Sequence, residues 1–511
     1  MTAGQRSSRR LWALMGTLAC AHAVLSGALA PGWRFAKYPH LAEGLARGSL
    51  TAAEVGDASA LYLLLNTWIA PGTLRWIQTV AAAAGVLLVF VLGRRLRGPV
   101  AGVTAAALYA FAQQVVLFSS VLEPDCFISL VMLAALTLAL VARPSLWRSV
   151  GTGVLLGLAV SLRPTAALVV LVALLVEWRS WRRVSRGREL LGRDVHGFAG
   201  AWTPSLRATA LLAGVCGLTA LAPHLLLELR EAHELKAAMS AGQVVHQGHR
   251  PEGSGVGPTF PLLLKLIELD EARLPDHKPD HQHELYRKLA MADLGPARPT
   301  EVERYWFAKT QAFLREHPWA FVQQLGRKVV LGLAVPDHDT DIPEVIELTQ
   351  AQQVPLVPIV ALVFAGLSGA LLCVRRSRVA RAVALAALSS QAVALVFFAQ
   401  ARYGLDVLPL WCVLAGGGAA APVAAARQVG RRLREEGAAG PETIAPAVLP
   451  SCSRCCLSRS SRPRSCDSSG GSTRACSSCR RIRKRPRSSA RACTRRRARS
   501  WSPRRRAFRT S

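Results

Sequence analysis

Three ionisable residues stand between apolar stretches of the sequence: Glu123, Asp125 and Arg163. Arg163 directly precedes Pro164 in the run "GLAVSLRPTAALVV". A cation at the bilayer centre and a proline in a helix interior each cost roughly 3 kcal/mol. At the end of a span, in contrast, an arginine can reach water or an anionic group. Glu123 and Asp125 belong to "VLEPD", where acids flanked by apolar residues indicate a functional site or a capped tight turn.

Three other patterns have the spacing of metal ligands, but their surroundings favour different roles. The stretch "DHKPDHQHE" (276–284) is typical of a solvated helix start or turn. The DxD pattern in "DHDTD" (337–341) lacks the βα pattern that surrounds a nucleotide site. The two Cys-x-x-Cys pairs at 452–455 and 476–479 are separated by Ser, Arg and Gly rather than by the hydrophobic residues of a zinc ribbon. The sequence therefore predicts no metal ligand among these residues. It indicates no particular cofactor, and a requirement for a divalent cation stays an alternative.

Membrane helices must position these residues, because the chain of 511 residues is 51% hydrophobic and repeats long apolar runs. Such runs approach the roughly 20 residues that cross a bilayer. The net charge of +31 is concentrated in residues 451–511, which hold 20 Lys and Arg and one acid. This tail has too few aliphatic residues to offset its ordering entropy, so we expect it to be disordered, or an out-of-frame end. We expect no specific nucleic-acid partner.

The apolar runs predict about ten spans. They cover 11–30, 74–93, 99–117, 127–141, two legs within 150–176, 208–227, 355–374, 379–399 and 404–425. Residues 150–176 form either one helix or a hairpin. The charge of the loop that follows distinguishes the two, because cytoplasmic loops carry an excess of Lys and Arg. A single helix would place the loop 179–207, with seven arginines and two acids, outside. A hairpin keeps this loop and both termini inside and puts Arg163 at the outer tip, with short legs that need tilt or membrane thinning.

The predicted fold class is an all-α polytopic membrane protein with a mixed, mostly helical extracytoplasmic lobe. Residues 1–227 form an N-terminal transmembrane module with a first outer loop at 31–73. Residues 228–353, with 19 of the 32 acids, form the lobe. Residues 354–425 are C-terminal transmembrane helices, and 426–511 are the basic cytoplasmic tail. In the lobe, "EVERYWFAKTQAFLREHP" predicts an amphipathic helix, and "GQVVHQGHRPEGSGVGP" a glycine-rich loop that either connects or covers the substrate.

Five parts of the chain, taken in order between about residues 11 and 425, resemble the GT-C class of polytopic glycosyltransferases. They are "KYPHLAEGLARGSL" with "GDASALYLLLN", "GVLLGLAVSLRPTAALVV", "GQVVHQGHRPEGSGVGP", "FLREHPWAFVQQLGRKVV" and "QARYGLDVLPLWCVLAG". They are similar to the first outer loop, the short hairpin, two parts of the outer lobe and the last span. Within the class, the chain most resembles glycosyltransferase family 39, the dolichyl-phosphate-mannose protein mannosyltransferases, and the bacterial lipid A sugar transferases.

This resemblance implies an inverting transferase in the cytoplasmic (inner) membrane. It would move a hexose or pentose from a polyprenyl-phosphate sugar to a lipid, glycan or protein acceptor at the outer face, among membrane lipids. The implied substrate-binding residues are Tyr38, Arg163, His249, Arg402 and Tyr403. A guanidinium suits phosphate geometry, so Arg163 and Arg402 would meet the donor phosphate, with lipid headgroups as their alternative partners.

Catalysis of this kind would need a carboxylate as general base, while the phosphate leaving group requires no strong acid. Relatives carry an aspartate ahead of the first-loop tyrosine, whereas "WRFAKYPH" has no acid before Tyr38. The remaining catalytic candidates are Asp57, Glu54, Glu123 and Asp125. A helix N-cap is the alternative role for Asp57. The alternative functions are a catalytically inactive GT-C-like scaffold and a polytopic transporter, which would need charges midway through its spans.

Overall fold

The structure is a computed structural model of the chain. It describes residues 3–28, 37–49, 59–119, 121–190, 204–228, 241–249, 282–334, 356–396 and 404–438. Within these ranges every regular element is helical, apart from one isolated parallel bridge between Ala112 and Val357. The predicted disordered tail beyond Ala438 lies outside the described residues.

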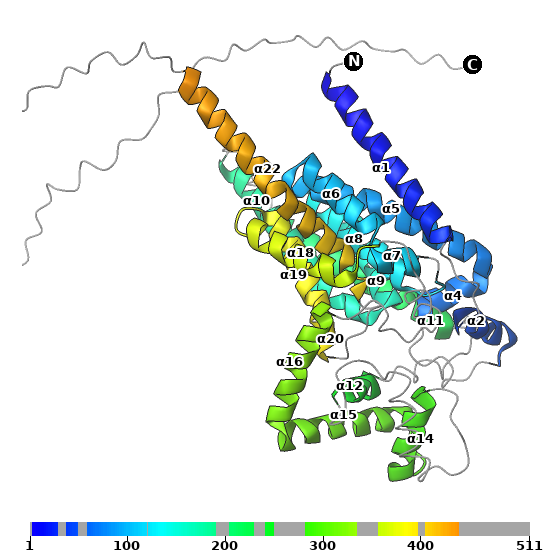
Figure 1. The fold of residues 1–511 in the computed structure, drawn as a ribbon. Coiled ribbons are helices and arrows are strands. Elements are labelled where there is room, and N and C mark those ends of the chain that lie inside the picture. The colour runs from blue at the N-terminus through cyan, green and yellow to red at the C-terminus, as the bar shows by residue number, and fades with distance from the viewer. Residues whose placement is uncertain are drawn as a thin grey trace, which may run out of the picture. The chain divides into compact units, whose positions relative to one another are not determined.

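The apolar runs form helices at each of the predicted places. These helices are α1 (Ala3–Ala28), α5 (Pro71–Arg97), α6 (Pro99–Ala110) with α7 (Gln113–Phe118), α8 (Asp125–Val141), α9 (Leu146–Leu162), α10 (Ala167–Leu190), α11 (Pro204–Glu228), α18 (Ile359–Cys373), α19 (Arg378–Gln391) with α20 (Val393–Val396), and α22 (Leu408–Ala438) (Figure 1). Among the described residues, five helices are long and apolar enough to cross a membrane, and four shorter apolar helices accompany them. The chain is an all-α polytopic membrane protein, as the sequence predicts.

Helices α5 and α6 show how the sequence sets a tight reversal between two spans. Pro71 lies at the start of α5, where a missing N–H costs nothing, and Arg94, Arg95 and Arg97 fill its last turn. Gly98 caps α5 with φ 92, a left-handed conformation that a side chain would disfavour, and α6 begins at the next residue. The two helices then cross closely, because a Cβ added at Gly102 would lie 2.7 Å from the carbonyl oxygen of Phe90.

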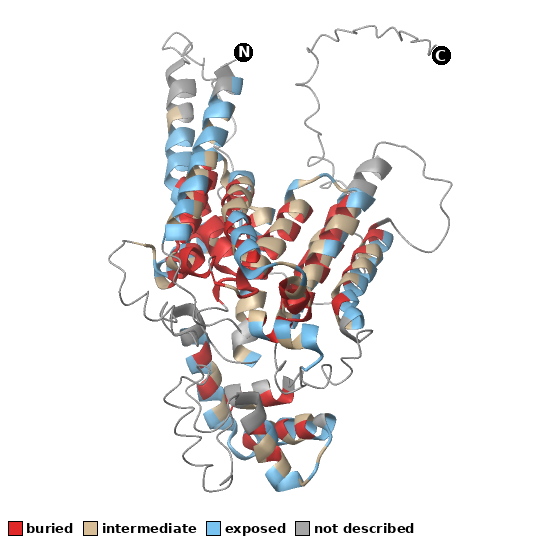
Figure 2. Cartoon of the chain, turned by 90° about the vertical axis from the view of Figure 1, so that its right-hand side faces the viewer, coloured by how far each residue is buried: buried red, intermediate tan, exposed pale blue. Residues whose placement is uncertain are grey.

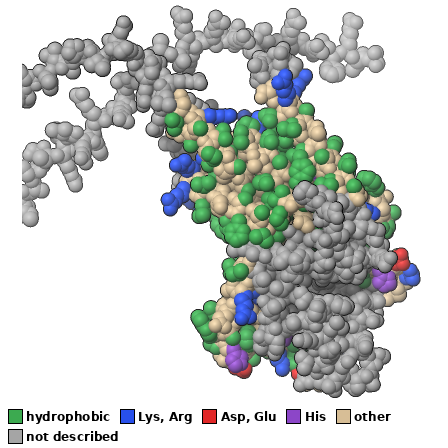
Figure 3. Space-filling model, viewed as in Figure 1, with side chains coloured by type: hydrophobic (Ala, Val, Ile, Leu, Met, Phe, Trp, Pro, Cys, Tyr) green, Lys and Arg blue, Asp and Glu red, His purple; other side chains and the backbone are tan. Residues whose placement is uncertain are grey.

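The bundle is apolar both inside and outside, which a lipid environment allows. Its buried core joins residues of α5, α6, α8, α9, α18 and α22, among them the fully buried Phe90, Ile128 and Leu408. Figure 2 shows the buried residues in red where these helices pack together. Large apolar side chains such as Leu171 and Leu371 face outward. Figure 3 shows hydrophobic side chains over the face of the bundle, with Lys and Arg at its margins.

The third predicted span is divided, because α6 ends at Ala110 and α7 begins at Gln113. The break is closed by the segment that leads into α18. The N–H of Gln113 donates to the carbonyl of Val357 at 3.0 Å, and the N–H of Val357 donates to the carbonyl of Phe111 at 2.9 Å. Backbone groups within a bilayer must find such partners, since no water is present to satisfy them.

The described part of the lobe that the sequence predicts to be extracytoplasmic consists of α12 (Ala241–His249), α14 (Gln282–Leu294), α15 (Pro299–Glu316) and α16 (Pro318–Ala334). Helix α15 confirms the predicted amphipathic helix: it buries Val302, Trp306 and Phe313, and His317 caps it before Pro318. The loop interpretation of "GQVVHQGHRPEGSGVGP" is wrong for residues 242–249, which belong to α12. These residues are helical because they pack against α15, where the centroid of the His246 ring lies 4.7 Å from that of the Trp306 ring.

Candidate functional site

The hairpin predicted at Arg163 and Pro164 is confirmed. Helix α9 ends at Leu162, Arg163 is extended with φ −155 and ψ 116, and Pro164–Ala166 form a single 3₁₀ turn before α10. Proline has no N–H to continue the helical hydrogen bonds, so it ends α9 here. The chain then reverses direction. The ion pair between Arg148, near the start of α9, and Glu177 in α10 shows this reversal.

The Arg163 side chain lies between two carboxylates that come from distant parts of the chain. Its Nη2 binds Asp125 at the start of α8, and its Nη1 donates to Asp406 Oδ2 at 3.1 Å, in the turn before α22. The three side chains are 15%, 1% and 9% exposed for Arg163, Asp125 and Asp406. We call these residues the acid–arginine cluster. With both acids ionised, it carries one net negative charge.

Each carboxylate of the cluster has one oxygen held by Arg163 and a second, open oxygen, where open means without a hydrogen-bond partner among the described residues. Asp125 Oδ2 and Asp406 Oδ1 are buried and have no hydrogen-bond partner among the described residues. A carboxylate that is oriented through one oxygen while the other is presented to a ligand can take a proton from a hydroxyl group. The cluster therefore has the arrangement of a general base with its positioning cation.

The first outer loop is connected to the hairpin tip through Tyr38, in α2 (Lys37–Arg47), and Ser59, which caps α4 (Ala60–Trp68). The Tyr38 hydroxyl accepts a hydrogen bond from the N–H of Ser59 at 3.0 Å. The Ser59 hydroxyl donates to the carbonyl of Ser161 at 3.3 Å, two residues before Arg163. These contacts bring the predicted Tyr38 to the same end of the bundle as the cluster.

The "VLEPD" turn is fixed through its main chain by Gln78 of α5. The Gln78 Nε2 donates to the carbonyls of Val121 at 3.0 Å and Glu123 at 2.7 Å, and its Oε1 accepts from the Tyr62 hydroxyl at 3.1 Å. Glu123 is buried, and Asp125 begins α8 two residues later. The turn thus carries both predicted acids, and the structure brings Asp125 to Arg163.

Four of the predicted site residues lie outside the described residues: Glu54, Asp57, Arg402 and Tyr403. Their roles stay predictions. Sequence reasoning missed Asp406, although a signal was present. It is a lone acid in the apolar run "YGLDVLPLW", a setting that indicates a functional residue.

His249 lies in α12 of the lobe, where it contacts a buried lysine. The Lys328 Nζ of α16 lies 3.1 Å from His249 Nε2 and donates to the carbonyl of Leu395 in α20 at 3.2 Å. The His249 ring stacks on Phe321 with 5.0 Å between ring centroids. Burial lowers the pKa of Lys328 to about 7, and burial followed by the Lys328 charge lowers the pKa of His249. The predicted contact of His249 with substrate stays a prediction.

Lys328 gives a testable pH dependence. In the unfolded chain a lysine has its ordinary pKa of about 10.4, so between about pH 7 and pH 10 the unfolded chain binds more protons. The free energy of unfolding should therefore rise with pH in this window. Lys328→Met should remove that part of the rise, whereas Lys309→Met, at a half-exposed position in α15, should keep it. Denaturation of the solubilised protein at pH 7 and pH 9 measures this, and equal slopes in the Lys328 variant and the parent would contradict it.

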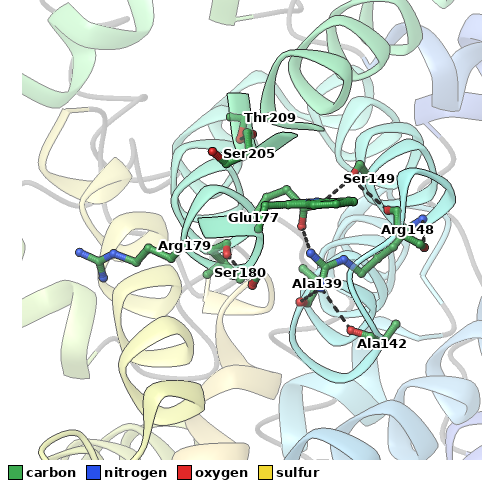
Figure 4. Close-up of polar contacts among 12 residues, drawn as sticks. Ala139, Ala142, Arg148, Ser149, Glu177, Arg179, Ser180, Ser205 and Thr209 are labelled. Carbon is green, nitrogen blue, oxygen red and sulfur yellow. Dashed lines mark hydrogen bonds and ion pairs between the residues drawn. The ribbon is translucent and has the colours of Figure 1, made fainter. Parts of the chain in front are cut away.

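A second buried ion pair lies at the other end of the α9–α10 hairpin. Arg148 binds Glu177, and its Nη1 also donates to the carbonyls of Ala139 at 3.3 Å and Ala142 at 3.2 Å. Glu177 further accepts from Ser149 and from Trp181 Nε1, the latter at 2.8 Å. Figure 4 shows Arg148, Ser149 and Glu177 pointing toward one another. The acid accepts hydrogen bonds from three side chains, those of Arg148, Ser149 and Trp181, so this pair holds α9 and α10 together at this end of the hairpin.

The residues at the acid–arginine cluster do not fit a metal ion. Among the residues that the structure describes, no group of three or more His, Cys, Asp and Glu side chains could hold one. At the cluster, the Arg163 guanidinium takes the position between two carboxylates that a cation would take. We therefore derive no step through a metal.

Comparisons with known proteins give one family and several solved structures. Residues 71–188 match the family described as dolichyl-phosphate-mannose-protein mannosyltransferase. No curated protein matches the chain. An archaeal oligosaccharyltransferase AglB from Archaeoglobus fulgidus, solved with an inhibitory peptide and a dolichol-phosphate, is 14% identical with a TM-score of 0.38, covering 84% of this chain and 52% of that one.

The same organism's oligosaccharyltransferase gives two further matches. The form tethered with an acceptor peptide is 12% identical with a TM-score of 0.37, covering 79% of this chain and 49% of that one. The complex with Zn and sulfate is 13% identical with a TM-score of 0.35, covering 78% and 48%. The chain thus spans about half the length of these structures. Over residues 71–188, which run from α5 into α10 and include Asp125 and Arg163, the family match confirms the resemblance to GT-C-class glycosyltransferases.

Proposed function

We propose that the chain is a membrane glycosyltransferase that moves a sugar from a polyprenyl-phosphate donor to an acceptor at the outer face of the cytoplasmic membrane. The acid–arginine cluster carries this proposal. It joins the "VLEPD" turn, the hairpin tip and the turn before α22, beside the first outer loop. Buried carboxylates gathered at the end of a helical bundle are costly, and such groups are retained where chemistry needs them.

The proposed reaction uses one carboxylate of the cluster as the base. The open oxygen of Asp125 or Asp406 takes the proton of an acceptor hydroxyl, and the hydroxyl oxygen forms a bond to the anomeric carbon of the donor sugar. The bond between that carbon and the phosphate oxygen breaks, so polyprenyl phosphate leaves and the configuration inverts. Arg163 orients both acids and balances part of their charge. Glu123, Glu54 and Asp57 stay candidates for the same role.

The donor phosphate needs a cation that is not already shared by two acids. Arg163 is so shared, so the proposed phosphate contact is Arg402, which precedes Tyr403 in the sequence. A guanidinium at the membrane surface can bind the phosphate while the prenyl chain stays in the lipid.

Sugar transfer by the purified chain in vesicles tests the function. The donors are polyprenyl phosphates that carry radiolabelled mannose, glucose or arabinose, and the acceptors are lipid extracts and glycans from the source envelope. Transfer from one donor is the expected result. Failure of every donor, together with unchanged envelope glycans after deletion of the gene, would leave a scaffold or a transporter as the function.

The proposed topology places the hairpin tip outside and the loop before α9 inside. Pro164 and Arg143 are both exposed, so a cysteine at either position is open to a thiol reagent. A membrane-impermeant maleimide added to spheroplasts should label Pro164→Cys several-fold above the parent chain and leave Arg143→Cys at background. Inside-out vesicles should reverse the pattern. The same labelling of both variants from one side would overturn the topology.

A further inference from the structure

Gln114 of α7 is a buried amide with no partner among the residues that the structure describes. Its side chain is almost fully buried, and neither Oε1 nor Nε2 has a hydrogen-bond partner among the described residues. A buried amide left in this state is costly, because both of its polar atoms have lost their water. Such a side chain in a packed bundle indicates a ligand that supplies the missing bonds.

The Gln114 amide faces the turn that carries Asp406. A Cβ added at Gly404 would lie 3.5 Å from Gln114 Oε1, and the N–H of Val407 closes this turn on the carbonyl of Gly404 at 3.2 Å. The open oxygen of Asp406 belongs to the same turn, and the open oxygen of Asp125 is held near it through Arg163. Among the described residues, three acceptor oxygens and one amide donor of these side chains therefore have no hydrogen-bond partner.

We propose that Gln114 and the acid–arginine cluster form a subsite for the neutral hydroxyl groups of a sugar. A hydroxyl both donates and accepts, so it can satisfy the carboxylate oxygens and the Gln114 N–H together. With both acids ionised, the cluster carries one net negative charge and repels a phosphate. An ammonium group could satisfy the oxygens but would leave the Gln114 N–H without an acceptor. The inference rests on the proposed function and assigns its hydroxyl-bearing substrate to this site.

The hydroxyls can come from the donor sugar or from an acceptor glycan, and kinetics separates the two sources. Gln114→Leu keeps the side-chain size and removes both polar atoms. If Gln114 binds hydroxyls of the donor sugar, the substitution should raise the KM for the polyprenyl-phosphate sugar. If it binds hydroxyls of the acceptor, the substitution should raise the KM for the glycan. Either rise should be roughly tenfold or more, with kcat little changed, because a hydrogen bond within a charged network is lost.

A matched control is available on α8. Thr137 is also buried, and its hydroxyl has no partner within the described part of the chain; it lies about 18 Å along the helix from Asp125, so Thr137→Val should change neither KM. Gln114→Leu should unfold at the same temperature as the parent chain or higher, because it removes an unpartnered buried amide. A lower unfolding temperature, with unchanged KM values, would mean that Gln114 is only structural.

Direct binding does not depend on turnover. Saturation-transfer NMR with the methyl glycosides of mannose, glucose and galactose should show binding of at least one sugar to the solubilised chain. The signal should fall to background in Gln114→Leu and persist in Thr137→Val. Absence of binding by every glycoside, competition by inorganic phosphate or ethylamine, or loss of the signal on adding EDTA would each overturn the proposal. Sugar binding without any transfer would instead contradict the proposed function alone.

Discussion

Replacing the catalytic member of the acid–arginine cluster by asparagine is expected to lower the rate of sugar transfer by roughly 10²- to 10⁴-fold, the usual contribution of a general base. The candidates are Asp125→Asn and Asp406→Asn. Asparagine keeps an oxygen for the bond from Arg163 but cannot take a proton at neutral pH. The loss should appear in kcat, measured with labelled donor in vesicles. If both variants transfer sugar at the parental rate, neither Asp125 nor Asp406 is the general base.

The two variants should fold, and the charge count of the cluster explains why. Two carboxylates share one guanidinium, so removal of one acid leaves a neutral pair, whereas Arg163→Gln leaves two buried acids without their cation. Uncompensated buried charge is strongly destabilising, by about 3–5 kcal/mol. We therefore expect poor yield for Arg163→Gln and parental yield for both asparagine variants. Asp293→Asn, at a partly exposed acid in the lobe, is the control for loss of one negative charge.

Arg148→Ala is expected to destabilise the chain by about 3–5 kcal/mol, because it leaves Glu177 buried and charged with only neutral donors around it. Both side chains of this pair are almost fully buried, at 3% and 0% exposure. The double variant Arg148→Met with Glu177→Leu should recover most of the loss, since apolar side chains of similar size suit the site. Denaturant unfolding of the solubilised protein measures both changes.

The chain offers a matched exposed pair as a control. Arg47 and Glu43 form an ion pair at 2.7 Å on α2, with side chains 71% and 64% exposed. Water screens such a pair, so Arg47→Ala should cost no more than about 1 kcal/mol. An equal effect of Arg47→Ala and Arg148→Ala would show that burial does not decide the strength of the Arg148 pair.

The sequence predicts where the chain enters and leaves the membrane, because hydropathy and loop charge are local properties. The hairpin at Arg163 follows from the seven arginines of the loop 179–207, which only a reversal keeps inside. The break between α6 and α7 does not follow, since residues 99–117 have the overall hydropathy of a single span even with Gln113 and Gln114 in it. Its cause is the pairing with Val357, a contact between segments far apart in the chain.

Individual charged residues of the candidate site could be predicted from the sequence, but which of them bind each other could not. Arg163 and Asp125 each stand out as charges beside apolar runs, which is why the sequence indicates both. Nothing local shows that they bind each other, or that Asp406 is the second partner, since 243 residues separate Asp406 from Arg163. The α12 helix was missed for a similar reason. Its glycines favour a loop, and its contacts with α15 override that local preference.

The bridge at Val357 joins the segment before α18 to Gln113, the residue next to Gln114. The hydrogen bonds of Val357 go to Gln113 and Phe111, and the α18 helix begins directly afterwards. Separating these segments would break two hydrogen bonds and leave four main-chain groups without these partners, at roughly 1–3 kcal/mol for each group that stays buried, so we expect the connection to be rigid. A displacement of Val357 would therefore be transmitted through this hydrogen bond to Gln113, one residue from the Gln114 amide of the proposed sugar subsite.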